Sequence, residues 1–383
     1  MIAPFLFYIK TKVYFGCEVL ESIPQISRLG KKPLIITGKH FVYSTGLLEK
    51  IQKKLENISI RWAIFSDVEE NPSVKTVEKA AQAFKGQGCD FVLGIGGGSA
   101  MDTAKAVAVL SSNSQGLNKY FGEELVQNPP CPIALIPTTS GTGSEVTRFS
   151  VIVDEDNNTK KTIASLSIMP DIAFCDPSLT YTLNPYLTAS TGLDALSHCI
   201  EGILSVRANP ITDILNKETI AMIFRWLPVA VKDGKDKQAR EQMMLSSLVA
   251  GVSLNCTGTM LGHGMGYTLT LDWSVHHGYA SLMFLPQIIS LIRERYAQRV
   301  EVLDKAFVGD FANRKVENSE GKIIELMEKI NLKPSLKTIG IEEKDIENLI
   351  TRIEKNSQRS LRNIGFKFTT QDIEQVVRKT AGS

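Results

Sequence analysis

The first half of the chain alternates short apolar runs with segments of helical periodicity. Four of these runs are nearly continuous in apolar residues, which is typical of strands in a parallel sheet covered on both faces: residues 33–37, 60–66, 90–96 and 131–137. Between them, residues 73–88 predict a helix that Ser73 could cap and that Gly86 or Gly88 could end. Residues 150–165 predict a strand, an Asp/Asn turn and a second strand. The pattern therefore predicts an α/β layered fold with ligand sites at the carboxyl ends of its strands.

The second half of the chain has a different pattern. After Pro185, long helical segments continue to the end of the sequence with almost no strand-like runs. We therefore expect an α/β domain over residues 1–184 and an all-helical domain over residues 185–383. At the start of the chain, residues 5–16 alternate well enough to predict a strand that would expose a sheet edge.

Composition narrows the class of protein. A chain of 383 residues suits two domains, and its 43% hydrophobic and 22% charged residues are typical of a soluble globular protein. A net charge of +2 without a basic block favours neither a nucleic-acid nor a membrane-surface partner. The six cysteines are scattered without a CxxC pair, which favours reduced thiols over a disulfide framework. The N-terminus lacks the features of a signal peptide, and no apolar run is long enough to span a bilayer, so we expect a cytoplasmic protein.

A glycine-rich loop at residues 93–106 follows a predicted strand and opens a helix. Gly97 and Gly98 would let a phosphate approach the backbone N–H groups. Ser99 could cap the helix, whose positive dipole end would then face the anion, and Asp102 has the spacing of a capping box. The motif matches neither GxGxxG nor the Walker pattern, so a glycine-rich turn without a ligand is the alternative.

A second polar loop, residues 137–147, follows the next predicted strand and is dense in Thr, Ser and Gly. Hydroxyl groups at the carboxyl end of a strand suit hydrogen bonds to phosphate or ribose oxygens. Since the two loops follow consecutive strands, we expect them to form one crevice, which favours a dinucleotide site.

Asp194 and His198 lie one turn apart on an otherwise apolar helix, residues 188–202, and therefore share a face. Burying both costs several kcal/mol unless they are paired or bound. A local Asp–His hydrogen bond or a half-exposed helix face would explain this segment alone. His263 and His277, each followed by glycine, could complete a set of three nitrogens and one oxygen that suits Fe(II) or Zn(II) and leaves room for a substrate oxygen. Separate core or surface histidines are the alternative.

Taken together, these motifs make the chain resemble the iron-containing, or group III, alcohol dehydrogenases, which have a dehydroquinate synthase-like fold with a Rossmann-like N-terminal domain. The matching segments are residues 96–105, 137–147, 176–202, 262–278 and the Leu-Pro pair at 285–286. The resemblance implies that Asp194, His198, His263 and His277 bind a divalent metal between the two domains, Fe(II) first and Zn(II) second. It also implies hydride transfer between a nicotinamide and a small alcohol, diol or aldehyde, with the metal polarising the substrate oxygen.

One position departs from the family pattern. Many members have a further His four residues after the third ligand, where this chain has Tyr267. A proton-relay role for that position is therefore in question, although the Tyr267 hydroxyl or His276 could replace it.

The dinucleotide site implied by the resemblance draws on both loops and on the end of the first strand: Gly38, Lys39, Asn71, Gly97, Gly98, Ser99, Asp102, Thr138, Thr139, Thr142, Ser144 and Lys161. Family members that prefer NAD tend to have Asp just after a Thr that ends this strand; here Gly38 follows Thr37. Gly38 removes a carboxylate that would repel a 2′-phosphate, and Lys39 offers a cation, so we expect NADP to be preferred over NAD. Alternatively, Lys39 points to solvent.

Two other functions compete with this one. A dehydroquinate synthase-like cyclase or a glycerol dehydrogenase-like metalloenzyme would share fold, metal and dinucleotide, but the cyclase would need basic residues for a phosphate-bearing substrate. A non-catalytic dinucleotide-binding scaffold would have no reason to keep four metal ligands. Relatives with this arrangement often pair their N-terminal strands, so we also expect a homodimer or a larger homo-oligomer.

Overall fold

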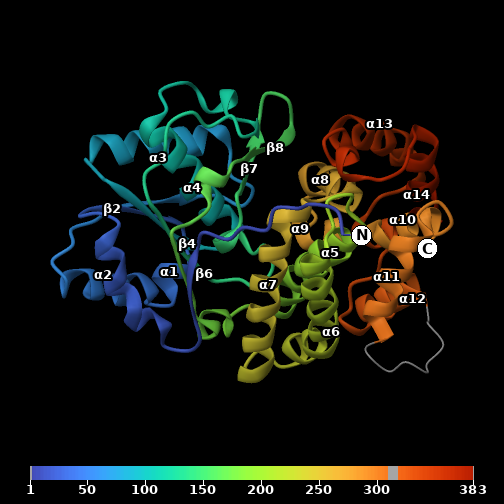
Figure 1. Cartoon of the computed structure of the whole chain (residues 1–383), viewed down its shortest axis with the longest axis horizontal. Helices are drawn as coiled ribbons and strands as arrows, with labels where there is room; N and C mark the ends of the chain where they lie inside the picture. The colour runs from blue at the N-terminus through green and yellow to red at the C-terminus, as the bar shows by residue number, and fades with distance from the viewer. Residues whose placement is uncertain (1, 309–317, 383) are drawn as a thin grey trace. The chain divides into compact units, whose positions relative to one another are not determined.

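The computed structural model describes residues 2–308 and 318–382 and divides into two compact units. The α/β unit comprises Ile9–Tyr181, and the helical unit comprises Met1–Tyr8 with Thr182–Ser383. The predicted combination of a Rossmann-like domain with an all-helical one is confirmed (Figure 1).

A six-stranded parallel sheet is the centre of the α/β unit, with strand order β1-β9-β6-β4-β2-β3. Its strands are β1 (Lys12–Phe15), β2 (Pro33–Gly38), β3 (Ala63–Val68), β4 (Phe91–Gly96), β6 (Ile133–Pro137) and β9 (Ile172–Cys175). The central strands β2, β4 and β6 are buried almost throughout, because helices cover both faces. This explains why their sequences are continuous apolar runs.

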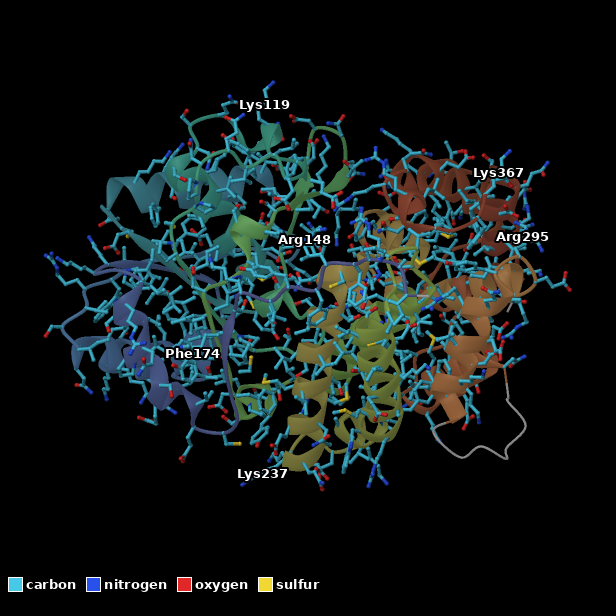
Figure 2. All side chains as sticks on the ribbon, viewed as in Figure 1. Lys119, Arg148, Phe174, Lys237, Arg295 and Lys367 are labelled. Carbon is cyan, nitrogen blue, oxygen red and sulfur yellow. The ribbon has the colours of Figure 1, made fainter. Side chains whose placement is uncertain are left out.

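Alternate residues of each central strand enter different cores. Leu34 and Ile36 pack beneath α3 (Val74–Gly86) and α4 (Gly98–Ser112), whereas Ile35 packs beneath α2 (Leu47–Glu56) and the 3-10 helix Val19–Arg28. Figure 1 shows α3 and α4 on one side of the sheet, with α2 and the short α1 (Phe41–Ser44) on the other. Figure 2 labels Phe174 of β9, which is fully buried in the second of these cores, and the exposed Lys119. Helices packed on both faces therefore fix the positions of the strand ends.

Most predicted elements of this unit are observed, with two corrections. The helix predicted over residues 73–88 is α3, which Ser73 caps by accepting the Thr76 N–H, and the predicted hairpin is β7 (Phe149–Asp154) with β8 (Thr159–Ala164), beside the short β5 (Gly122–Glu123). The strand predicted over 60–66 begins only at Ala63. Ile60 is buried although it lies outside the sheet, so its apolar side chain was mistaken for part of the strand. The strand predicted over 5–16 is confined to β1, since the residues before Lys12 lack strand pairing.

The helical unit is built around the buried helix α5 (Pro185–Leu204), which packs against α6 (Pro210–Lys232), α7 (Lys237–Thr257) and α9 (His277–Met283). The remaining helices are α8 (Leu261–Asp272), α10 (Leu285–Ile292), α11 (Ala297–Val308), α12 (Ser319–Lys329), α13 (Ile346–Ser357) and α14 (Thr370–Gly382). Among the described residues, no single helix has the length and apolar character needed to cross a membrane; only the bent pair α7 and α8, which meet at 112°, passes that test jointly.

Candidate metal centre and dinucleotide site

Helix α5 positions the first part of the candidate metal centre. Asn184 caps the helix by accepting the Leu187 N–H, Pro185 occupies its first turn, and residues from Thr188 to Leu204 are all buried. Asp194 and His198 lie one turn apart on this helix and are both buried. The exposed-face alternative for the pair is therefore excluded.

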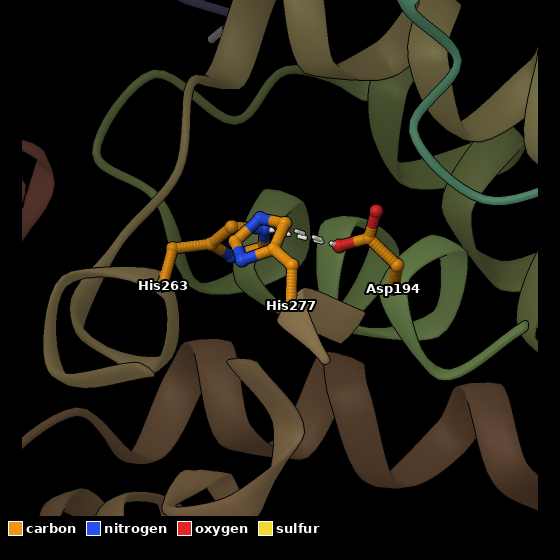
Figure 3. A group of neighbouring side chains, drawn as sticks. All are labelled: Asp194, His263 and His277. Carbon is orange, nitrogen blue, oxygen red and sulfur yellow. Dashed lines mark ion pairs between the residues drawn. The ribbon is translucent and has the colours of Figure 1, made fainter. Parts of the chain in front are cut away.

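The structure brings the predicted ligands Asp194, His263 and His277 into one group and places His198 next to Asp194. The Nε2 atoms of three histidines surround Asp194 Oδ1, at 3.5 Å for His263, 3.7 Å for His198 and 3.8 Å for His277. Figure 3 shows Asp194, His263 and His277 pointing toward one another from α5, α8 and α9, and their ligand atoms lie within 4.8 Å of one another. A tetrahedron with metal–ligand bonds of about 2.1 Å has an edge of about 3.4 Å, so the distances to Asp194 suit one shared divalent ion.

Unsatisfied polar atoms support the same fit. Asp194 Oδ1 and His263 Nε2 are buried and have no hydrogen-bond partner. Buried polar atoms are rarely left in this state, because each costs about 1–3 kcal/mol. A local Asp–His hydrogen bond, the simpler explanation of the α5 pair, does not satisfy Asp194 Oδ1. The donor set therefore fits a metal ion held by one carboxylate and three imidazoles.

The electrostatics of the four groups are strongly coupled. Burial disfavours the ionised form of Asp194, but the neighbouring imidazoles of His198, His277 and His263 outweigh burial and hold the pKa of Asp194 far below its ordinary value. Burial also lowers the pKa of His263, yet Glu201 and Asp194 outweigh it and raise that pKa to about 9. Asp194 is thus held in its ionised form and presents a buried negative charge to the three imidazoles.

Glu201 is part of this centre and was not among the predicted residues. It is fully buried on α5, and its Oε2 lies 2.7 Å from Nδ1 of His263. The signal was present in the sequence: Glu201 follows Asp194 by two helical turns and His198 by one, so the three share a face.

Tyr267 and His276 lie beside the ligands. The Tyr267 ring is half-buried and stacks on His277, with centroids 5.4 Å apart and an interplanar angle of 28°. His276 Nδ1 lies 2.6 Å from Ser190 Oγ on α5, and that oxygen also accepts the Tyr279 N–H. Both side chains are therefore held in fixed positions next to the candidate ligands.

In the α/β unit, the two predicted polar loops pack against each other. They follow the adjacent strands β4 and β6, and the Thr138 N–H donates to Gly96 O. A Cβ on Gly97 would lie 3.3 Å from the Thr139 side chain, and one on Gly98 would lie 2.7 Å from Thr142 Cγ2. The second loop approaches the backbone of Gly97 and Gly98 too closely for larger side chains. These two glycines are also the residues at which α4 begins.

The predicted capping of α4 is wrong. Gly97 is the N-cap residue, and Ser99 lies in the first helical turn, where its Oγ accepts the Asn71 N–H. Asp102 does not form a capping box, because its carboxylate accepts hydrogen bonds from Ser144 Oγ and from the Val151 N–H. Partners from distant segments, 28 residues away for Ser99 and more than forty for Asp102, therefore bind the groups that a local pattern assigned to the cap.

Lys105, which was not predicted from the sequence, also joins α4 to the second polar loop. It is fully buried in α4 and donates to Ser144 Oγ, Thr147 Oγ1 and Phe149 O at 2.8, 3.0 and 2.8 Å. Burial lowers the pKa of Lys105 to about 8 against the charges of Asp102 and Glu145. An apolar helix face carrying one lysine was the available signal.

The remaining predicted cofactor residues come from other segments of the α/β unit, and of these Asn71 contacts the glycine-rich loop. Gly38 ends β2 opposite Val68, and the exposed Lys39 has its Nζ 3.7 Å from Asp67 Oδ1. Lys161 in β8 forms an ion pair with Asp154 at 2.5 Å. Asn71 has a left-handed backbone with φ of 55° and contacts Ser99 through its N–H.

Comparison with known families gives a direct match over nearly the whole chain. Residues 10–177 match the family described as iron-containing alcohol dehydrogenase, and residues 188–381 match the C-terminal domain of the Fe-containing alcohol dehydrogenase family. The chain belongs to the iron-containing alcohol dehydrogenase family. It is therefore an oxidoreductase of the alcohol and aldehyde class.

Individual proteins are similar to this chain over most of its length. The chain is 32% identical to the NAD-dependent methanol dehydrogenase of Bacillus methanolicus, over 97% of this chain and 98% of the relative. It is also 32% identical to alcohol dehydrogenase 4 of Schizosaccharomyces pombe, over 92% and 83% of the two chains. An iron-containing alcohol dehydrogenase from Thermotoga maritima has a similar structure, with a TM-score of 0.88, 34% identity and coverage of 99% and 100%.

Proposed function

We propose that the chain transfers a hydride between a nicotinamide dinucleotide and a small alcohol, diol or aldehyde, using a divalent ion held by Asp194, His198, His263 and His277. The observation that carries the proposal is the buried convergence of three imidazole nitrogens on Asp194 Oδ1, an atom without a hydrogen-bond partner. When bound, such an ion supplies Lewis-acid polarisation of a substrate oxygen. Fe(II) is the first choice because of the family, and the ligand set also suits Zn(II).

The nicotinamide cofactor, which supplies the hydride acceptor or donor, is assigned to the loops after β4 and β6. Its pyrophosphate would be bound by the N-terminus of α4 at Gly97, Gly98 and Ser99, where backbone N–H groups and the helix dipole favour an anion. Thr138, Thr139 and Thr142 are assigned to the ribose and nicotinamide. Asp102 and Ser144 shape this site through their mutual hydrogen bond, whereas Asn71 and Lys161 are assigned to its rim.

NADP is proposed as the preferred nicotinamide. Position 38 carries no carboxylate to repel a 2′-phosphate, and the Lys39 side chain is 59% exposed and able to turn from Asp67 toward a ligand. A Cβ on Gly38 would meet only Val68 O, at 3.4 Å, so an acidic residue fits there. Gly38→Asp should raise the Michaelis constant for NADP and spare that for NAD. A wild-type enzyme that prefers NAD in matched kinetics contradicts this assignment.

Tyr267 is proposed to contribute to catalysis as the proton relay. It follows His263 by one turn of α8 and stacks on His277, so its hydroxyl is carried on a ring fixed beside two proposed ligands. Tyr267→Phe should lower kcat while leaving the bound metal at the wild-type level. Unchanged kcat would transfer the role to another group, with His276 the nearest alternative.

A homodimer or larger homo-oligomer is proposed from the N-terminal segment. Ile2, Phe5, Leu6 and Tyr8 are large apolar side chains with 44–71% exposure, and β1 is an edge strand with one side unpaired in the sheet order. Light scattering should give at least twice the chain mass of 42.2 kDa. A mass equal to one chain would refute the proposal.

We also propose a cytoplasmic location, without a nucleic-acid or membrane partner, and a functional division of the chain near residue 184. None of the six cysteines, all within the described residues, forms a disulfide, which is consistent with a reducing compartment.

The first experiment combines metal analysis with nicotinamide absorbance over a panel of small alcohols and aldehydes. His263→Ala should lose both metal and turnover while keeping the fold, because the ion joins side chains from three helices and does not form the core. If that variant keeps stoichiometric metal and normal turnover, the ligand assignment is wrong.

A further inference from the structure

Glu201 makes three contacts that together define the orientation of His263. Its Oε2 accepts the Met260 N–H at 2.9 Å and lies 2.7 Å from His263 Nδ1, while its Oε1 accepts the His263 N–H at 3.2 Å. The carboxylate is fully buried, so water does not compete for it. One side chain of α5 thus holds both the backbone and the ring of a residue on α8.

The contacts replace a missing helix cap. Helix α8 begins after Met260, which has no side-chain capping bond of its own. Two N–H groups at this helix start are instead satisfied by Glu201, and a carboxylate is also favourable next to the positive end of the helix dipole. The start of α8 is therefore attached to α5 at the same point where His263 projects from it.

The ring contact also selects a tautomer. An ionised carboxylate can only accept hydrogen bonds, so a contact of 2.7 Å places a proton on Nδ1 of His263. In the neutral ring, Nε2 then carries a lone pair, and this nitrogen is the buried atom without a hydrogen-bond partner, 3.5 Å from Asp194 Oδ1. Hydrogen-bonded carboxylates orient metal-binding histidines in this way.

We propose that Glu201 is a positioning residue that sets the Nδ1–H tautomer and the ring orientation of His263 and thereby governs how tightly and how long the metal is held. This inference rests on the proposed metal centre. The contact of Glu201 with His263 Nδ1 is short and involves a fully buried carboxylate, so it acts directly on one of the four proposed ligands.

Glu201→Gln tests the proposal with little change of shape. A glutamine has one acceptor oxygen in place of two, so in either amide orientation an N–H group faces another N–H group, and the negative charge is lost. We expect metal affinity to fall about tenfold to a hundredfold and the dissociation rate into a chelator to rise correspondingly. Both quantities are measured by loading the metal-free full chain with Zn(II), without any activity assay.

Asp372→Asn is the matched control. Asp372 is a buried carboxylate of the helical unit that accepts the Thr369 N–H and binds Arg295, but it does not contact the proposed ligands. The Asp372→Asn substitution should lower thermal stability without changing the Zn(II) dissociation rate. Equal rates for wild type and Glu201→Gln would overturn the proposal for Glu201 while leaving the metal centre intact. A wild type that binds no stoichiometric ion would overturn both.

A second measurement does not depend on whether the variant folds. The chain has five histidines, so ¹⁵N labelling of histidine gives a small set of ring signals in the Zn(II)-loaded wild type. The His263 ring, assigned in the wild type through its own backbone amide, should show a protonated Nδ1 and a metal-bound Nε2. A metal-bound Nδ1 would contradict the inference.

Discussion

Gly278 packs against α5 at a point where one added methyl group would disturb the proposed metal centre. It follows His277 on α9, and a Cβ added to it would lie 2.0 Å from the backbone oxygen of Ser190 and 2.7 Å from Asp194 Cβ. Ordinary van der Waals contact begins at 3.4 Å, so the alanine Cβ of Gly278→Ala would lie about 1.4 Å too close to Ser190 O. This oxygen belongs to the backbone, which cannot rotate away as a side chain could. Helices α5 and α9 must therefore separate by roughly that distance.

The separation acts on the metal ligands before it acts on the fold. His277 moves with α9, whereas Asp194 and His198 stay with α5. Metal–ligand distances are tolerant to about 0.2 Å, so a shift of roughly 1 Å removes His277 from the shared ion. Overpacking of this kind costs about 1–3 kcal/mol in stability. We expect Gly278→Ala to remain folded with a melting temperature several degrees lower, and to lose most of its bound metal and turnover.

Metal content per chain, circular dichroism and thermal melting measure these effects on the purified variant. Gly86→Ala is the matched control, because a Cβ at this helical glycine meets no atom within 4 Å. It should melt at or slightly above the wild-type temperature and keep its metal. If Gly278→Ala retains the wild-type metal content and affinity, the argument that this glycine sets the α5–α9 distance is refuted.

Two further predictions concern the buried polar groups of the α/β unit. Lys105→Met removes the three hydrogen bonds that join α4 to residues 144–149, so dinucleotide affinity in a fluorescence titration should fall by at least about tenfold, whereas the exposed Lys79→Met should not change it. Burial raises the pKa of Glu145 from 4.5 to about 7, against a hydrogen bond to its own backbone N–H and the charge of Lys105. The folded state thus favours protonated Glu145. The protonated carboxyl contributes to the free energy of unfolding below pH 4.5, and this contribution is lost as the pH rises through 7. Glu145→Gln should flatten the stability profile over this window, by up to the order of 3 kcal/mol, and an unchanged profile would contradict the assignment.

The sequence predicted the sheet well because its central strands are buried on both faces. Leu34, Ile35 and Ile36 all pack in a core, and continuous burial produces a continuous apolar run that is visible without tertiary information. The same rule misplaced the start of β3, because Ile60 is equally buried in a segment outside the sheet. An apolar side chain records burial and does not record hydrogen-bond pairing.

Local spacing identified only those polar roles that local geometry determines. Asp194 and His198 were found because one helical turn brings them together. Asp102 was misassigned as a helix cap because its partners, Ser144 and Val151, come from a later segment, and Glu201 was overlooked although it shares the face of Asp194. Charged residues on apolar helices are therefore better treated as members of tertiary polar clusters than as local caps.

The two His-Gly pairs explain how proposed ligands that are distant in sequence come close together. Each histidine projects from a helix that packs closely on a neighbour, and the following glycine makes the approach possible. A Cβ on Gly264 would lie 2.7 Å from Ser360 Oγ, and one on Gly278 would enter the backbone of α5. In both pairs the histidine carries the proposed ligand atom and the glycine sets the distance to the neighbouring segment. A His-Gly pair on a predicted buried helix therefore carries information on tertiary packing, which the histidine alone does not.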